Sequence, residues 1–182
     1  MEPLAKAYKP KGKSESPLLQ DFHSFRQGLN VASADQRVFV VLQGSDDQLK
    51  AAQETMRPIA WSDDMIGRFH YDSSPEADWD KAITGLNDEP GIHLIMPGEF
   101  GQEGKLHKSL PLNASAADIR NAMFAANEFF AANTDLKVYS SHITKGRKEG
   151  IHFEGAVPYG EDRDADGVID HGGGKGRGKG RY

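Results

Sequence analysis

The sequence predicts an α/β domain built on a mixed four-stranded sheet with helices on both faces, followed by an extended C-terminal tail. Three observations support this prediction. The continuous β-branched run Arg37–Gln43 is typical of a strand buried on both faces. Strand-like and helix-patterned segments alternate from that run to about residue 86. Two further strand-like runs between Glu89 and Leu110, separated by a Gly/Pro-rich loop, predict a β-hairpin.

Composition limits both the size and the chemistry of the protein. The chain has 182 residues, which suits one domain with tails, and 37% of its residues are apolar. The mean hydropathy of -0.62 reflects mainly the two polar ends. The sequence contains no cysteine, which excludes disulfides, thiolate metal sites and every thiol-based redox mechanism.

The distribution of polar residues predicts three regions. Residues 1–15 hold four lysines, two prolines and a glycine, and we expect a flexible leader. Residues 16–140 form the expected domain, beginning with an N-terminal helix. Residues 141–182 form the expected extended tail, which contains an acidic segment and a terminus rich in glycine, lysine and arginine.

The first half of the domain contains signals for two helices and two strands. Ser16 and Pro17 suit the start of an amphipathic helix from Pro17 to Gln27. After the strand Arg37–Gln43, Ser45 and Gln48 form a capping-box pattern for a second helix. Its predicted buried face is Leu49, Ala52 and Met56, and Pro58 marks its end. A second strand is expected at Met65–Tyr71.

The second half contains signals for two helices around the hairpin. Ser74-Pro75 suits the start of a helix whose predicted inward residues are Trp79, Ala82, Ile83 and Leu86. After the hairpin, Ser115 suits the N-cap of an alanine-rich helix. The predicted buried face of that helix is Ile119, Ala122, Met123, Ala126 and Phe130. Residues 137–140 suggest a short strand, and an extended chain is expected from Lys145.

The predicted order of elements over residues 35–132 resembles the thioredoxin-like fold, with a β-α-β half, a helix and a β-β-α half. The segment Glu89-Pro90-Gly91-Ile92 resembles the cis-proline loop of that family. The family's Cys-x-x-Cys motif would fall at 44–48, where this chain has Gly-Ser-Asp-Asp-Gln. The resemblance therefore implies a scaffold without disulfide exchange, with a shallow groove between the helix N-terminus and the proline loop.

Three functional classes remain open. A redox-inactive binding or assembly module with a protein partner is the first. The second is an enzyme with a non-thiol or metal-dependent site in the groove; the sequence names no catalytic residue for it. Paired acids such as Asp46 and Asp47 begin a predicted helix and suit its positive end. The third is binding of nucleic acid or an acidic surface through the glycine-rich tail, where Lys175, Arg177, Lys179 and Arg181 alternate with glycine.

The acidic segment of the tail resembles an EF-hand or dockerin-like calcium loop. Asp162, Asp164, Asp166 and Asp170 occupy ligand positions one, three, five and nine, and the Val168 carbonyl occupies position seven. Gly167 permits the sharp turn. An EF-hand has a bidentate Glu at position twelve, where this chain has Gly173, so the pattern predicts weak affinity. A solvated acidic linker is the alternative.

Two further expectations concern metal and compartment. His93 and His107 are symmetric about Phe100, so a simple hairpin would place them opposite each other, as a cross-strand pair or as two ligands of a metal. No apolar run has the roughly 20 residues that a membrane span requires. A genuine calcium loop would favour a secreted or periplasmic protein; the compartment otherwise stays open.

Overall fold

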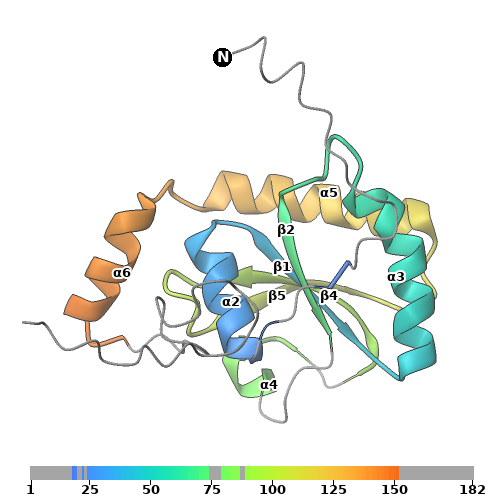
Figure 1. The fold of residues 1–182 in the computed structure, drawn as a ribbon, viewed down its shortest axis with the longest axis horizontal. Coiled ribbons are helices and arrows are strands. Elements are labelled where there is room, and N and C mark those ends of the chain that lie inside the picture. Colours follow the sequence, from blue (N-terminus) through green and yellow to red (C-terminus); the bar gives the residue numbers. More distant parts are fainter. Residues whose placement is uncertain (1–17, 20–21, 23, 74–78, 87–88, 152–182) are drawn as a thin grey trace, which may run out of the picture.

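The computed structural model describes residues 18–19, 22, 24–73, 79–86 and 89–151. They form an α/β domain around a mixed five-stranded sheet in the order β2-β1-β4-β5-β3 (Figure 1). The strands are β1 (Val38–Gln43), β2 (Phe69–Ser73), β3 (Ile83–Thr84), β4 (Gly91–Pro97) and β5 (Gly104–Leu110). β1 is parallel to β2 and antiparallel to β4, and β4 is antiparallel to β5. The hairpin predicted between Glu89 and Leu110 is thus confirmed.

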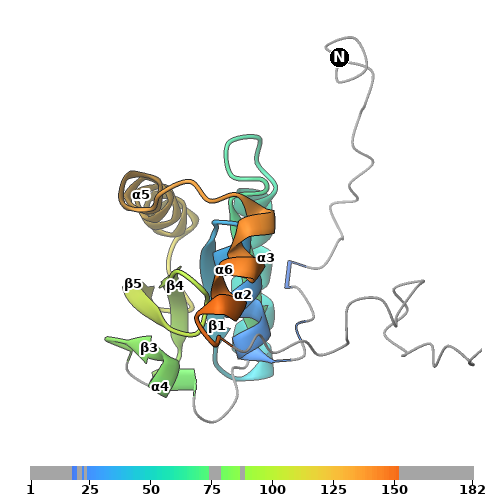
Figure 2. The same cartoon turned by 90° about the vertical axis from the view of Figure 1, so that its left-hand side faces the viewer.

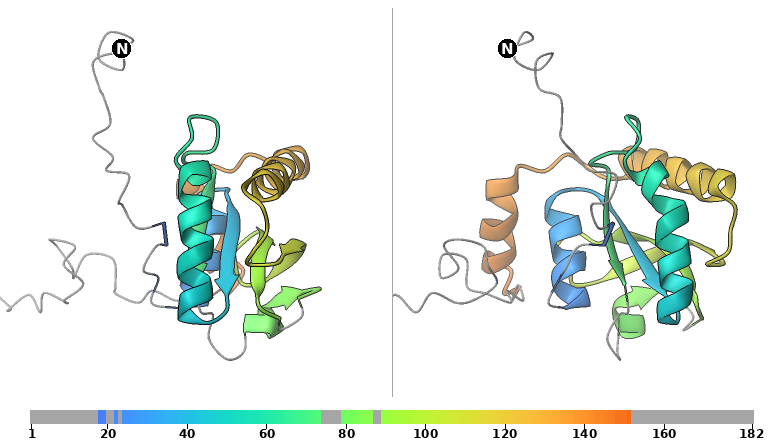
Figure 3. Two further views of the ribbon diagram at one scale, coloured as in Figure 1. Left: turned by 90° about the vertical axis from the view of Figure 1, so that its right-hand side faces the viewer. Right: turned by 45° about the vertical axis from the view of Figure 1, so that its right-hand side comes forward.

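Helices α3 (Asp46–Ala60) and α5 (Ala116–Asn133) cover one face of the sheet, and α5 runs across the end of α3 (Figure 3). The larger apolar core lies beneath them. Every residue predicted for the inner faces of these two helices is buried: Leu49, Ala52, Met56, Ile119, Ala122, Met123, Ala126 and Phe130. β1 alternates between this core and the opposite one, which explains its continuous apolar run.

The other face carries α2 (Phe25–Ala34) and the short α4 (Trp79–Ala82). Their core contains Phe25, Leu29, Phe39 and Trp79. The helix predicted at Pro17–Gln27 is placed wrongly, because Ser24 is the N-cap. The Ser24 hydroxyl accepts a hydrogen bond from the Gln27 N–H at 3.0 Å, which fixes the first turn eight residues later than expected.

The fifth strand is a correction to the four-stranded prediction. Ile83 and Thr84, which we expected on a helix beginning at Ser74, instead pair in parallel with Gly104 and Lys105 of β5. Both are β-branched and favour strands. A Cβ at Gly104 would lie 3.0 Å from Ile83 Cδ1, so glycine permits this close approach. Residues 74–78, where the helix was to start, lie outside the described part.

Three other boundaries differ from the prediction. β2 begins at Phe69 and not at Met65, because 61–68 form turns in which Gly67 has a φ of 76°. Tyr139 and Ser140, expected at the end of a short strand, and residues 145–148, expected to begin an extended chain, belong to α6 (Tyr139–Lys148); the expected tail from residue 152 lies outside the described residues. The peptide bond before Pro90 is trans, as are all others among the described residues, so the likeness to a cis-proline loop does not hold there.

Helix α6 lies next to α2, beyond the loop that joins β4 to β5 (Figure 2). The connection from α5 to α6 is attached to the turn before β1: Gln36 Nε2 donates to the Asp135 carbonyl at 2.7 Å, and the Lys137 N–H donates to Gln36 Oε1 at 2.9 Å. No helix among the described residues has both the length and the apolar character of a membrane span.

Candidate functional site

The C-terminal end of β1 and the start of β4 form one end of the sheet. Gln43, the last residue of β1, pairs with Gly91, the first of β4, so the start of α3 and the Glu89–Pro90 segment are neighbours. This is the place to which the thioredoxin-like resemblance assigned a groove. The Cys-x-x-Cys position is occupied by the start of α3.

The polar residues at the start of α3 serve the helix. Gln48 Oε1 accepts from the Ser45 N–H and from the Ser45 hydroxyl, each at 3.1 Å, which confirms the capping pattern. Asp46 and Asp47 lie exposed in the first turn, where the helix dipole favours negative charge. Their position accounts for these acids without any catalytic role.

His93 is the most deeply buried polar side chain at this end, with 1% of its surface exposed. Its Nδ1 lies 2.9 Å from Ser109 Oγ on β5, and its Nε2 lies 3.1 Å from the Glu89 carbonyl oxygen. The Trp79 ring meets the imidazole edge to face, with centroids 5.5 Å apart. A Cβ at Gly91 would lie 3.2 Å from His93 Cε1, so this glycine leaves room for the ring.

His107 lies away from His93, so neither alternative raised by the sequence, a cross-strand histidine pair or a two-histidine metal site, is formed. The pairing of β4 with β5 shifts at Leu94/Ile95, so that Leu106 and Lys108 are paired while His107 is the extra residue of a β-bulge. His93 is therefore opposite Ser109. The His107 ring packs on Phe129 of α5 at 4.8 Å, and burial lowers the pKa of His107. Among the described residues no group of three or more His, Asp or Glu side chains is placed to hold a metal ion.

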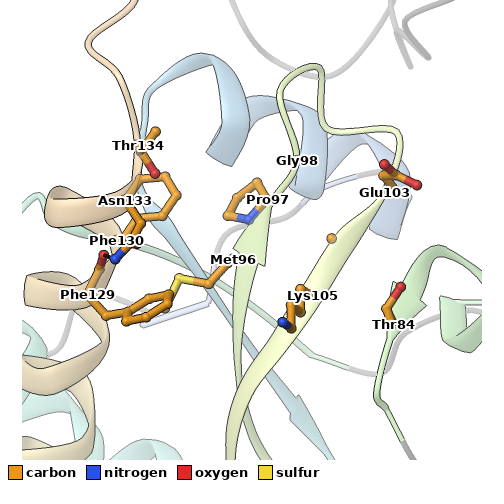
Figure 4. A pocket seen from close by; sticks show the side chains of 11 residues that line it. Thr84, Met96, Pro97, Gly98, Glu103, Lys105, Phe129, Phe130, Asn133 and Thr134 are labelled. Atoms are coloured by element: carbon orange, nitrogen blue, oxygen red, sulfur yellow. Dashed lines mark hydrogen bonds between the residues drawn. The ribbon is translucent and has the colours of Figure 1, made fainter.

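A hollow of about 400 Å³ lies toward the other end of the sheet, where β4 ends and β5 begins (Figure 4). Met96 of β4 extends toward the Phe129 ring of α5, and Thr84 of the edge strand β3 closes the far side. Its lining comprises Thr84, Met96, Pro97, Gly98, Glu103, Gly104, Lys105, Phe129, Phe130, Asn133 and Thr134. The hollow exists because α5 covers β4 and β5 but leaves the β3 edge open.

A smaller cavity of about 180 Å³ lies between the β4–β5 loop and α6. The Lys145 ammonium is paired with the Glu99 carboxylate and lies 5.7 Å from the centre of the Phe100 ring. The hydrogen bond from Lys145 holds the pKa of Glu99 below its usual value. His142 stacks on Phe100 at 5.5 Å, and burial lowers its pKa. These contacts attach α6 to the loop.

Helix α2 fixes the same loop from the other side. Asn30 Nδ2 donates to the Phe100 carbonyl at 2.8 Å, and the Ser33 hydroxyl lies 2.7 Å from the Gly98 carbonyl oxygen. At Gly101, with φ 64°, a Cβ would lie 2.4 Å from Asn30 Cα. The loop that borders both cavities is therefore held rigidly by polar contacts and by a close backbone approach.

The predicted calcium ligands Asp162, Asp164, Asp166, Val168 and Asp170 lie outside the described residues, as does the basic end of the tail. Sequence reasoning did not identify Ser109 or Phe129 as candidates. Ser109 could not be identified from the sequence, because the bulge at His107 sets its pairing with His93 and nothing in the residue pattern predicts that bulge. Phe129 lies outside the predicted buried face of α5, and its exposure next to a hollow depends on the tertiary arrangement.

Comparisons with protein-family models, with curated proteins and with solved structures found no match, so the findings assign the chain to no family. The sequence and the structure show a cysteine-free α/β domain with a mixed five-stranded sheet.

Proposed function

We propose that this chain is a redox-inactive binding module on a thioredoxin-like scaffold, and that it binds an extended segment of a protein partner at the hollow beside β3. The observed strand order and directions support the scaffold. A parallel β1-α3-β2 unit is followed by the antiparallel β4–β5 hairpin and α5, which is the succession that the resemblance implies. The absence of cysteine excludes the thiol chemistry.

The observation that carries the binding proposal is an apolar hollow at a sheet edge. Its volume of about 400 Å³ is within the range of ligand pockets, roughly 300–1,000 Å³. Phe129 is 48% exposed beside it, and Met96 offers a flexible wall that adapts to different side chains. Edge strands accept extended peptides through backbone hydrogen bonds, with alternate side chains entering pockets. A peptide along β3 with one large apolar residue over the hollow fits this geometry.

A peptide selection tests the proposal with a matched pair of variants. A random peptide library displayed on phage is selected against the full chain, and the affinities of the selected peptides are measured by calorimetry. Phe129→Ala should weaken binding about tenfold or more, since a buried aromatic contact contributes about 1.5 kcal/mol or more. Phe124→Ala is the control, because Phe124 is 47% exposed on the same helix but does not line the hollow.

Either of two results would overturn the binding proposal. One is a selection that enriches no peptide. The other is a set of peptides that bind wild type and Phe129→Ala equally well.

We also propose that the acidic segment of the tail binds calcium weakly. Four carboxylates within nine residues repel one another, and a divalent cation would relieve that repulsion. Without a Glu at position twelve, we expect a Kd on the order of 10⁻⁴ to 10⁻³ M. Calorimetric titration of calcium into wild type and Asp164→Ala, with magnesium for comparison, tests the site. Equal and negligible heats in both proteins would leave a plain acidic linker.

A further inference from the structure

Ser109 and His93 form a pair whose chemistry the binding proposal does not use. They lie on neighbouring strands at the end of the sheet opposite the hollow, and each is the other's cross-strand partner. The serine is exposed on the surface, whereas the histidine is buried. The hydroxyl of an exposed serine thus contacts an imidazole that the protein shields.

The contacts of His93 determine which of its ring nitrogens carries the proton. A carbonyl oxygen only accepts hydrogen bonds, so the contact of 3.1 Å to the Glu89 carbonyl requires a proton on Nε2. In the neutral ring Nδ1 is then an acceptor, and the Ser109 hydroxyl at 2.9 Å donates to it. The Ser109 hydroxyl, the His93 ring and the Glu89 carbonyl are thus linked by hydrogen bonds as nucleophile, base and orienting group, the arrangement that activates a nucleophile.

We propose that Ser109 is an activated nucleophile that accepts acyl groups from small activated esters or thioesters, with His93 as its general base. Ser109 Oγ attacks the acyl carbonyl carbon while its proton passes to His93 Nδ1. The bond between that carbon and the leaving oxygen or sulfur then breaks, and the leaving group takes the proton from Nδ1. The product is an ester at Ser109 and a free alcohol or thiol, so atoms and charge balance.

The surroundings favour small donors. Ser109 lies on the strand surface and lines neither of the two cavities described above, so a bulky substrate would gain little binding there. Trp79 covers one side of the imidazole and Gly91 leaves the space in which the ring lies. The Trp79 contact holds the base in place, and the burial of His93 limits its access to water. We therefore expect one acylation per chain and not rapid turnover.

The test uses p-nitrophenyl acetate as the acyl donor on the full chain, with the acetylated residues identified by peptide mass spectrometry. Ser109 should be labelled on the order of 100-fold faster than Ser45, within the range that general-base catalysis supplies. Ser45 is a suitable internal control. It is also exposed, but its hydroxyl donates to the Gln48 amide oxygen, which is no base at neutral pH.

Two further measurements distinguish nucleophile activation from a merely structural hydrogen bond. His93→Gln should reduce labelling of Ser109 to the rate of Ser45. Because His93 is buried and the variant can fail to fold, the pH profile of the wild type provides the second readout. Labelling of Ser109 should fall as protonation of His93 removes the base, while the ratio to Ser45 approaches one. Equal labelling of the two serines at neutral pH, or a ratio independent of pH, would overturn the proposal.

Discussion

Among the glycines that the structure describes, Gly101 is the one at which a side chain is least tolerable. It combines a φ of 64° with a backbone neighbour 2.4 Å from the position of a Cβ. Gly67 has a similar φ of 76° but no atom within 4 Å of that position. Gly67→Ala should therefore lower the free energy of unfolding by about 1–2 kcal/mol, the cost of a left-handed backbone for a residue with a Cβ. Gly101→Ala should lose more than about 3 kcal/mol, since the loop must also move off α2. Urea denaturation of both variants checks this, and equal losses would contradict it.

His70 makes stability depend on pH. Burial lowers the pKa of His70, and the hydrogen bond from its Nε2 to the Asp35 carboxylate, at 2.9 Å, opposes that shift only in part. With a lowered folded-state pKa, the unfolded chain binds the proton first as the pH falls. The free energy of unfolding should therefore decrease from about pH 6.5 down to the folded-state pKa, by at most about 1.4 kcal/mol per pH unit for this site.

The matched variant for that prediction is His70→Phe, which suits the adjacent Phe22 ring and removes the titration. Its free energy of unfolding should vary less than that of the wild type between about pH 7 and 5. Some dependence should remain, because the pKa values of His107 and His142 are also lowered. Parallel curves for variant and wild type would show that His70 does not contribute.

At the level of elements, α6 is attached to the β4–β5 loop through Lys145 and His142. Lys145 pairs with Glu99, and the aromatic contact of His142 with Phe100 lies nearby. Lys145→Ala should speed amide hydrogen exchange across residues 139–148, because local opening becomes easier there, and should leave the global melting transition nearly unchanged. Lys148→Ala, on the same helix, is the control. Equal exchange in both variants would mean that the Glu99 pair does not hold α6.

Elements with strong local signals were predictable from the sequence. β1, α3 and α5 have a continuous apolar run or a capped helical face, and each appears where it was expected. β3 has only two residues, and it forms because Gly104 of β5 leaves room for Ile83 to pair with it. The contact of Lys145 in α6 with Glu99, which lies 46 residues earlier in the chain, likewise has no signal in a local pattern. Tertiary pairing overrides local preference in such short elements.

The same contrast applies to the candidate sites. The capping role of Ser45 follows from its spacing to Gln48 and was predictable. The Ser109–His93 pair was not, because an error of one residue in register exchanges the partners across a hairpin. The hollow requires knowledge of how far α5 extends over the sheet, which no stretch of sequence contains.

For the whole molecule, we expect the two ends of the chain to be dispensable for folding. Residues 1–12 and 172–182 contain few large apolar side chains, so their removal sacrifices little burial. A chain lacking both segments should retain a cooperative thermal transition close to that of the full chain. Calorimetry of the shortened protein tests this. A broad transition, or one at a much lower temperature, would show that one of the removed ends is needed for folding.

The bulge at His107 changes which face of the sheet each later residue of β5 meets. Before it, Leu106 packs on the α2 side of the sheet; after it, Leu110 packs on the α5 side and Ser109 meets His93. In a regular ladder without the bulge, His107 would pair with Leu94, which would place Ser109 opposite Ile92 and Leu110 opposite Gly91, so Ser109 and Leu110 would exchange faces. A polar hydroxyl would then point at the larger core and a leucine at the imidazole. The single extra residue in the bulge therefore keeps the Ser109 hydroxyl against His93 and Leu110 in the larger core.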